Sequence, residues 1–598
     1  MSTSTSPQGG QFIINDITPT EVFTPEDFSE EQQMMKAAVQ EFIDREVWPH
    51  KPRFEKGDYD FTKECMEKAG QLGFLSVGVP EAYGGLDMGF VSVMLVCDYI
   101  SSVSGSFSTA FGAHTGIGTL PITLYGTEKQ KQHYVPKLAS GEWFGAYCLT
   151  EPGAGSDANS GKTKAVLSED GTHYLISGQK MWISNAGFAN VFTVFARIEE
   201  DKNITGFIVP YDPDNGITLG EEEHKLGIHA SSTRQVFFNE TKVPVENMLS
   251  ERGAGFKIAM NSLNAGRIKL AAACLDSQRR IITGAVQYAN ERIQFKTPIS
   301  QFGAIKEKIA RMAASCYVGE SASYRAAGDV EAKIESLKAE GRSPQEAELK
   351  GLENFAIECS ILKIAISEDI QICADEGIQI LGGMGFSAET PMEGAWRDAR
   401  ISRIYEGTNE INRMLAVGML FKKAMKGELD MMSTVMQIGE EVKKGVQNEN
   451  TSENNALATE HHLTQNFKKV FLMIAGAAVQ KFGTDLEKHQ QLLTALSDIL
   501  IETYLSESAV LRTRKNIEKS SEEDQKYPIQ MTQYYLYEAS EIVSKKGREA
   551  IISIATDAEQ QSMLAALRDY CNYAQWPNVI ELKTSIADKV IAENKYCF

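Results

Sequence analysis

The chain has 598 residues, of which 42% are hydrophobic and 23% are charged, as is typical of a soluble globular protein. A chain of that length is too long for one hydrophobic core, so three or four domains are expected. The formal net charge of -20 argues against nucleic acid as a partner, because phosphate binding needs a basic surface.

Cysteine and histidine spacing gives no sign of a disulfide framework or a metal centre. The nine cysteines are scattered without a C-x-x-C pair, and the nine histidines form no H-x-x-x-H pair. Residues 1–16 are polar and lack both the apolar run of a signal peptide and the arginines of a transit peptide. No run of about 18 uncharged apolar residues predicts a membrane span. We therefore expect a cytoplasmic, bacterial protein without a metal.

Apolar periodicity divides the chain into units. Helical spacing marks the first part, through residues such as Met34, Phe42 and Val47. Short β-branched and aromatic runs bounded by Gly, Asn, Asp and Pro follow and indicate an antiparallel β domain. Long Ala-rich helical patterns then return, and a Glu-, Lys- and Asn-rich stretch at 424–456 has the composition of a linker. The expected units are 27–145 (helical), 146–252 (β), 253–425 (helical) and 457–598 (an additional helical unit).

Two motifs carry the chemistry. In Ile404-Tyr-Glu-Gly-Thr-Asn-Glu-Ile411 a carboxylate, Glu406, stands between an aromatic residue and a glycine. Such a pair suits proton transfer where a substrate approaches the backbone closely, although the run alone is more often the start of a plain helix. The second motif, Tyr147-Cys-Leu-Thr-Glu-Pro-Gly-Ala-Gly-Ser156, offers two glycines for close ligand approach and two hydroxyls. Its alternative interpretation is a Pro-Gly turn between two elements.

These two motifs, in this order of helical, β and helical units, resemble the acyl-CoA dehydrogenase family over about residues 27–425. The additional helical unit makes the chain similar to the very-long-chain acyl-CoA dehydrogenase subgroup. The resemblance implies an α+β fold with an N-terminal helical domain, a middle antiparallel β domain, a C-terminal helical bundle and an extra helical domain. It also implies dehydrogenation of fatty acyl-CoA to trans-2-enoyl-CoA in β-oxidation, with electrons passing to an electron-transfer flavoprotein.

The resemblance further implies FAD as cofactor. In the family, the segment at 147–156 lines the flavin ring and the thioester, Trp182 covers the flavin, and Ser184 bonds near its N5 atom. Arg292 resembles a pyrophosphate contact, which the planar guanidinium suits. Because that contact and its partner segment come from the neighbouring subunit in the family, a homodimer or larger homo-oligomer is expected. The expected FAD contacts are Tyr147, Leu149, Thr150, Gly155, Ser156, Trp182, Ile183, Ser184, Arg292, Phe295, Gln379, Ile380, Gly382, Gly383, Thr408, Asn409 and Glu410.

Glu406 is the catalytic base by resemblance, and water exclusion is expected to raise its pKa toward the operating pH. Some relatives place the base just before the arginine of the helix that here reads Asn264-Ala-Gly-Arg267. That position is Gly266, which has no side chain to act as a base. Arg267 resembles the substrate-side arginine of the family, and its alternative role is an ion pair in helix packing. The expected substrate contacts are Ser156, Asn264, Arg267, Tyr405 and Gly407.

Small residues at Gly112, Ala113 and Gly116 predict a deep acyl tunnel and a preference for long acyl chains, close helix packing being the alternative. The unit at 457–598 is expected to contact the dimer partner and to allow peripheral membrane contact. Its basic clusters, 512–526 and 545–548, are modest and predict solvated helix faces rather than a membrane-binding surface.

Two other functions stay open at this stage. One is a scaffold or assembly protein with weak or no catalysis on the same fold, and the intact Glu406, Thr150, Trp182 and Arg292 argue against it. The other is an acyl-CoA oxidase, which differs in how oxygen reaches the reduced flavin. The stability of the reduced flavin in air would separate an oxidase from a dehydrogenase.

Overall fold

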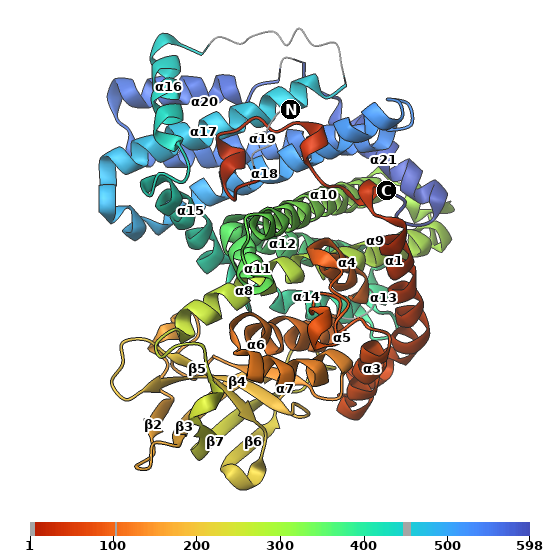
Figure 1. Cartoon of the computed structure of the whole chain (residues 1–598). Helices are drawn as coiled ribbons and strands as arrows, with labels where there is room; N and C mark the ends of the chain where they lie inside the picture. Colours follow the sequence, from red (N-terminus) through yellow and green to blue (C-terminus); the bar gives the residue numbers. More distant parts are fainter. Residues whose placement is uncertain (1–5, 102–104, 447–455, 574) are drawn as a thin grey trace.

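A β sheet, a central helical bundle and an overlying layer of long helices follow one another from one end of the molecule to the other (Figure 1). The computed structural model describes residues 6–101, 105–446, 456–573 and 575–598. This order confirms the predicted fold of helical, β and helical domains with an extra helical domain. Within the described ranges, no helix is long and apolar enough to cross a membrane.

Two of the N-terminal helices begin with a capping box. Ser29 accepts a hydrogen bond from the backbone N–H of Gln32, and Thr127 accepts one from that of Gln130, and in both pairs the glutamine bonds back to the cap. This capping box satisfies backbone donors that a helix start leaves free. The helices are α1 (Glu30–Phe42), α2 (Lys51–Glu55), α3 (Tyr59–Gln71), α4 (Gly89–Ile100), α5 (Gly105–Gly112), α6 (Leu120–Tyr125) and α7 (Glu128–Ser140), with a π-helical turn, η7 (Ala113–Gly118), after α5.

The main sheet has the strand order β6-β7-β3-β2-β4-β5-β8, with β1 beside β4. Most pairs are antiparallel, but β1 and β2 both run parallel to β4, so the prediction of a purely antiparallel domain is wrong in this part. Alternating burial fixes which face a strand presents, not the direction of its neighbour. The strands are β1 (Gly145–Cys148), β2 (Lys164–Leu167), β3 (His173–Ser184), β4 (Val191–Ile198), β5 (Thr205–Pro210), β6 (Ile217–Glu222), β7 (Thr233–Pro244) and β8 (Met248–Leu249), and a separate hairpin pairs β9 (Ile293–Gln294) with β10 (Thr297–Pro298).

The central bundle is built around α12, which packs against α8, α9, α10, α14 and α15. Its residues are apolar on all sides over Ile361–Ile366, apart from one lysine, and a helix of that kind is stable only when surrounded. The bundle's helices are α8 (Gly255–Ala272), α9 (Leu275–Glu291), α10 (Gly303–Ala339), α11 (Pro344–Asn354), α12 (Ala356–Leu381), α13 (Gly383–Phe386), α14 (Met392–Ile401) and α15 (Asn409–Met425).

The linker predicted at 424–456 contains a helix, α16 (Met431–Lys444). Met431 and Ile438 are buried, and Val435 packs against Gly476. Apolar residues at positions i, i+4 and i+7 therefore outweigh the polar composition on which the linker prediction was based. The predicted linker residues at 447–455 lie outside the described residues.

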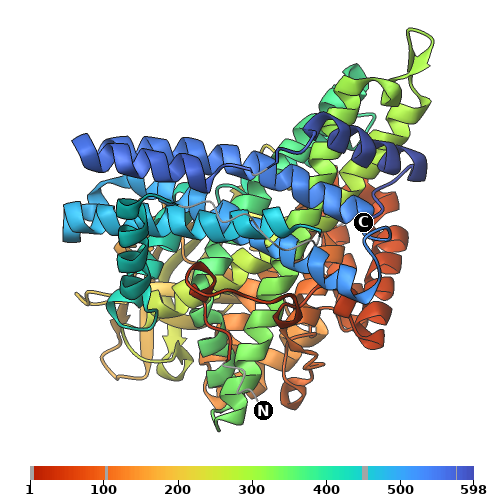
Figure 2. The ribbon, with the colours of Figure 1, turned by 90° about the horizontal axis from the view of Figure 1, so that it is seen from above.

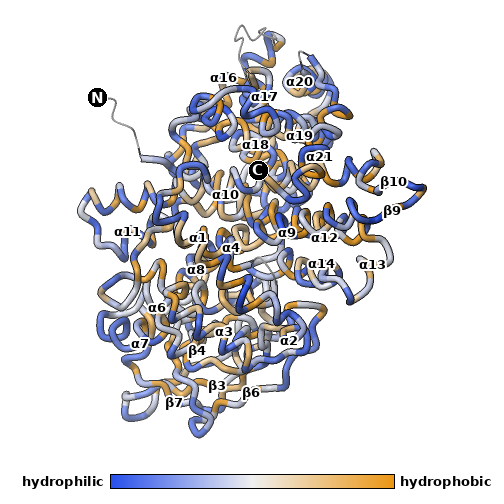
Figure 3. The backbone as a smooth tube through the Cα atoms, turned by 90° about the vertical axis from the view of Figure 1, so that its right-hand side faces the viewer, coloured by the Kyte–Doolittle hydropathy of each residue, from blue (hydrophilic) through white to orange (hydrophobic). Residues whose placement is uncertain are grey.

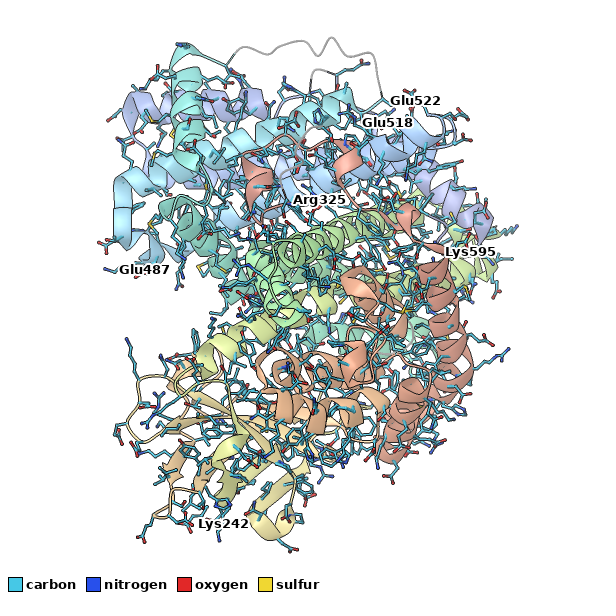
Figure 4. All side chains as sticks on the ribbon, viewed as in Figure 1. Lys242, Arg325, Glu487, Glu518, Glu522 and Lys595 are labelled. Carbon is cyan, nitrogen blue, oxygen red and sulfur yellow. The ribbon has the colours of Figure 1, made fainter. Side chains whose placement is uncertain are left out.

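The overlying layer crosses the central bundle, as the view from above shows (Figure 2). Buried ion pairs fasten it: Arg325 of α10 meets Glu507 at 2.8 Å (Figure 4), and Arg512 meets Glu320 at 2.8 Å. The predicted solvated face is therefore wrong for Arg512, whose side chain is 3% exposed because it is turned inward to these carboxylates. The helices are α17 (Ala458–Phe482), α18 (Gln490–Lys519), α19 (Lys526–Ile554), α20 (Asp557–Tyr570) and α21 (Val579–Glu593).

Candidate active site

The loop between α14 and α15 carries the first motif. Glu406 has a φ of 58° and Gly407 a φ of 83°, and the left-handed region is uncommon for a residue with a side chain. Thr408 ends the loop by capping α15, where it accepts a hydrogen bond of 3.3 Å from the Ile411 N–H. Glu410, in the first turn of α15, is exposed. The turn directs the Glu406 carboxylate toward α8, which approaches it at Gly266 without room for a side chain.

Arg267 holds this loop from α8. Its Nε donates to the backbone carbonyl of Glu406 at 3.1 Å, and one of its terminal nitrogens donates to Oδ1 of Asn264 at 2.8 Å. No carboxylate lies within ion-pair distance of Arg267 in the described part of the chain, so the ion-pair alternative does not apply. The structure thus brings together four of the residues predicted for substrate or catalysis: Asn264, Arg267, Glu406 and Gly407.

A second cation, which the sequence interpretation missed, reaches the same loop from α12. Lys363 donates to the Gly407 carbonyl at 2.8 Å and to Oδ1 of Asn409 at 2.7 Å. The Asn409 amide in turn donates to Glu368 at 2.9 Å. The Asn409 side chain is therefore bonded inside the protein, and its backbone N–H donates to the Arg403 carbonyl at 3.1 Å. A single lysine within the apolar run of α12 was the available sequence signal.

Burial and charge together set the proton affinity of Glu406. Burial raises its pKa to about 7, and the cations of Arg267 and Lys363 oppose that rise. Oε2 of Glu406 is buried and has no hydrogen-bond partner among the described residues. Burial lowers the pKa of Lys363 to about 7, against the attraction of Glu406, and raises the pKa of Tyr147. A carboxyl with a pKa near neutrality and an unoccupied oxygen is suited to accept a proton.

The second motif forms an open loop after β1. A Cβ added at Gly153 or Gly155 would have no atom within 4 Å, and Ser156 is exposed. The Met181 N–H donates to the Thr150 carbonyl at 3.0 Å, which ties the loop to β3.

The strand at that point is irregular. A register shift between Lys180 and Ile183 accompanies a φ of 60° at Trp182, whose side chain is 53% exposed beside the loop. Ile183 is buried beneath, and Ser184 pairs with Thr233 of β7.

A buried ion pair supports this loop and was also missed. Nζ of Lys180 lies 2.7 Å from a carboxylate oxygen of Glu151, and both side chains are less than 8% exposed. The same ammonium donates to the carbonyls of Leu149 and Phe195, at 3.2 and 2.7 Å. Strand β3 is thereby bound to the residues on either side of Thr150.

The remaining predicted cofactor residues lie elsewhere. The β9–β10 hairpin projects from the body of the molecule, away from the main sheet, with α13 on the same side (Figure 3). Arg292 and Gln379 are exposed, and Phe295 at the hairpin tip is 90% exposed. Gly382 and Gly383 have open space around them, while Ile380 is buried. One chain therefore does not bring this group together with the loop at 147–156.

A cavity of about 90 Å³ lies next to Tyr405 and is lined by Ser108, Leu270 and Trp48 among others. A Cβ added at Gly112 or Gly116 would have no atom within 4 Å. Gly118 behaves differently, because a Cβ there would stand 2.8 Å from the backbone of Gly145. Close packing against strand β1 thus accounts for Gly118, and close packing does not account for Gly112 and Gly116.

Comparison with known proteins identifies the family. The middle domain of acyl-CoA dehydrogenases matches residues 146–241, their N-terminal domain 29–142, and two C-terminal domain models 253–419 and 466–569. A probable acyl-CoA dehydrogenase from Bacillus subtilis (strain 168) is 41% identical over 589 residues, 98% of each chain. The chain belongs to the acyl-CoA dehydrogenase family.

A solved structure and a mammalian relative support the same assignment. The acyl-CoA dehydrogenase of Bacillus anthracis, determined as a complex with FAD, has a TM-score of 0.95 and 41% identity, with 99% of this chain and 100% of that chain covered. The very long-chain specific acyl-CoA dehydrogenase of Bos taurus is 33% identical over 529 residues, 83% of this chain and 76% of its own. The family and the enzyme class predicted from the sequence are confirmed.

Proposed function

We propose that this chain dehydrogenates acyl-CoA thioesters with FAD as cofactor and Glu406 as the base that removes the α-proton. The observation that carries the proposal is the carboxyl of the half-buried Glu406: its Oε2 is buried and unpartnered among the described residues, and its pKa is raised to about 7. A normal carboxylate is too weak a base for the α-proton of a thioester. A raised pKa increases the proton affinity of the carboxylate, and a pKa near neutrality still leaves part of it ionised and able to accept a proton.

The loop also offers help for the charge that develops on the thioester oxygen. No acceptor is found for the Glu406 backbone N–H in the described part of the chain. A preorganised donor of this kind contributes about 3–4 kcal/mol when it meets the oxygen of an enolate-like transition state. The backbone carbonyl of Glu406 accepts a hydrogen bond from Arg267. This bond fixes the direction of the peptide units around the base.

FAD, when bound, accepts the β-hydrogen as hydride. The open loop at Gly153, Gly155 and Ser156 fits a flat ring system that needs close backbone approach. Trp182, exposed at the irregular part of β3, offers an aromatic face beside it. The ring would be held by Tyr147, Leu149, Thr150, Gly155, Ser156, Trp182, Ile183, Ser184, Thr408, Asn409 and Glu410.

The adenosine and pyrophosphate of FAD would be held by the partner subunit of a homodimer. Arg292 and Phe295 are exposed on a hairpin that points away from their own β domain (Figure 3). A fully exposed phenylalanine beside an arginine is typical of a surface that is covered in the assembled protein. The partner would contribute Arg292, Phe295, Gln379, Ile380, Gly382 and Gly383.

The substrate class is proposed to be long-chain acyl-CoA, with electrons leaving to an electron-transfer flavoprotein in β-oxidation. The cavity beside Tyr405 and the open space at Gly112 and Gly116 support a deep acyl site. Asn264, Arg267, Ser156 and Gly407 would line the thioester and its CoA side.

The decisive experiment is anaerobic mixing of the purified protein with saturated acyl-CoAs from short to very long chains, followed by the flavin absorbance. Bleaching by acyl-CoA, strongest for long chains, is the expected result, and Glu406→Gln should retain FAD and lose bleaching. Flavin that no chain length bleaches would favour a scaffold protein instead. Rapid reoxidation when air is admitted would favour an acyl-CoA oxidase.

A further inference from the structure

Lys363 is a fully buried cation without a counter-ion. Its exposure is 0%, and no carboxylate lies within ion-pair distance among the described residues. Two other buried lysines are paired: Lys180 with Glu151, and Lys468 with Glu507. Burial of an unpaired charge is unfavourable, so the position calls for a specific partner.

The partners of Lys363 are polar groups of the loop that carries Glu406. The ammonium donates to the Gly407 carbonyl at 2.8 Å, directly after Glu406, and to Oδ1 of Asn409 at 2.7 Å. The Gly407 carbonyl accepts a second bond of 2.8 Å from the Asn412 amide. A left-handed backbone at Glu406 is unfavourable and persists only when its surroundings hold it.

We propose that Lys363 is a positioning residue for the base: its ammonium fixes the loop through Gly407 and Asn409, and its charge favours the ionised carboxylate of Glu406. The proposal rests on the proposed function, in which Glu406 takes the α-proton. Lys363 touches neither substrate nor flavin in this scheme and acts through Glu406 alone.

The charges around Glu406 make the effect of Lys363 separable. Arg267 is the other cation whose charge lowers the pKa of Glu406, while burial raises it. Loss of the lysine charge therefore leaves burial opposed by one cation instead of two, and the pKa of Glu406 rises. The titratable groups that face Glu406 and Lys363 from the surrounding elements are Arg267 (α8), Tyr147 (β1), Tyr405 (loop), Cys274 (before α9), and Cys359 and Glu368 (α12).

The test is the pH profile of kcat/KM for the wild type, Lys363→Met, Lys363→Gln and Lys363→Arg, each loaded with FAD. Glu406 acts only when ionised, so activity rises with pH through its pKa of about 7, which gives the profile a rising limb. Burial lowers the pKa of Lys363 to about 7, so the lysine carries its charge on the acidic side of that limb. The Met and Gln variants should move this rising limb of the profile to higher pH by about one unit. At pH values below the limb, kcat/KM then falls by about tenfold, and above the limb the loss in kcat/KM is smaller. The Arg variant keeps the charge and should keep the position of the limb.

Two comparisons make the result decisive. Lys423→Met removes a half-buried lysine, one that donates to the carbonyls of Gly9 and Asn354 at the far end of α15, and should leave the limb in place. Gln at 363 retains a hydrogen-bond donor, so it tests the charge even if the Met variant fails to fold. An equal loss at every pH, with the limb unmoved, would overturn the proposal. Glu406→Gln, run in parallel, separates the two claims, because its retained turnover would refute Glu406 as the base whatever Lys363 does.

Discussion

A Cβ atom built on Gly266 would lie 2.6 Å from Oε2 of Glu406 and 2.8 Å from its Cδ. Side chains do not approach a carboxylate that closely, so α8 and the catalytic loop can meet only with glycine at this position. The two places where relatives of this chain carry their base are thus neighbours in space. The Glu406 carboxylate fills the volume that a side chain at position 266 would need.

Gly266→Ala should therefore disable the enzyme without removing its cofactor. The added methyl displaces the Glu406 carboxylate by about 1 Å, and a shift of that size at a reacting group lowers kcat by about 100-fold. Steady-state kinetics and FAD content measure the two effects. Gly418→Ala is the matched control, because a Cβ at this position of α15 meets nothing within 4 Å. Full turnover in Gly266→Ala would mean that the carboxylate moves aside at no cost.

Sequence patterns pointed to Glu406 and Arg267, which the structure brings together, because both belong to contiguous motifs of residue types that the predicted chemistry requires. The contact of Lys363 was not predicted, because its partner is the backbone carbonyl of a residue 44 positions away. Every residue has a backbone carbonyl, so residue type does not indicate which one a lysine will bind. The close approach of Glu406 to Gly266 was not predicted either. The sequence shows that a glycine cannot be a base, but it does not show which side chain occupies the space beside that glycine.

Errors in the fold have different causes. At α16, a polar average over 424–456 concealed the apolar positions Met431, Val435 and Ile438, which a search at helical spacing would have found. In the β domain, the β-branched and aromatic runs correctly indicated strands, yet the parallel pairing of β1 and β2 with β4 depends on how the chain returns to the sheet. Long-range connection is a tertiary property that local periodicity does not report.

Mixing two inactive variants should restore activity if the FAD site is shared between subunits. In a hybrid dimer of Arg292→Ala with Glu406→Gln, one site combines an intact Glu406 with the intact arginine of the other chain. The second site carries both defects. About half of the wild-type activity per hybrid dimer is expected, because one of its two sites is intact.

Differently tagged chains, co-expressed and purified in two steps, supply these hybrids, and dimers of each single variant are the controls. If Arg292 binds the FAD of its own chain, every site in the hybrid carries one defect and the mixture stays inactive. That outcome would contradict the assignment of the exposed hairpin to a neighbouring subunit.

Gly112→Leu should discriminate against long substrates. A Cβ added at Gly112 meets no atom within 4 Å, and the rest of a leucine would extend into room proposed for the acyl chain. Long-chain kcat/KM is expected to fall by about tenfold or more, while short-chain kcat/KM changes little. The ratio of the two, measured on one preparation, is its own control. Equal losses for both substrates would place the acyl chain elsewhere.

Glu507→Gln should loosen the extra helical layer from the bundle. Glu507 is 1% exposed and lies between Arg325 and Lys468, whose side chains are 2% and 5% exposed. Without its charge, both cations stay buried and unpaired, which lowers the free energy of unfolding by about 3–5 kcal/mol. Thermal or urea unfolding measures the loss. Lys129→Gln breaks the exposed pair with Glu246 and should change it by less than about 1 kcal/mol. A loss no larger than this control would show that the interface tolerates the two cations without their carboxylate.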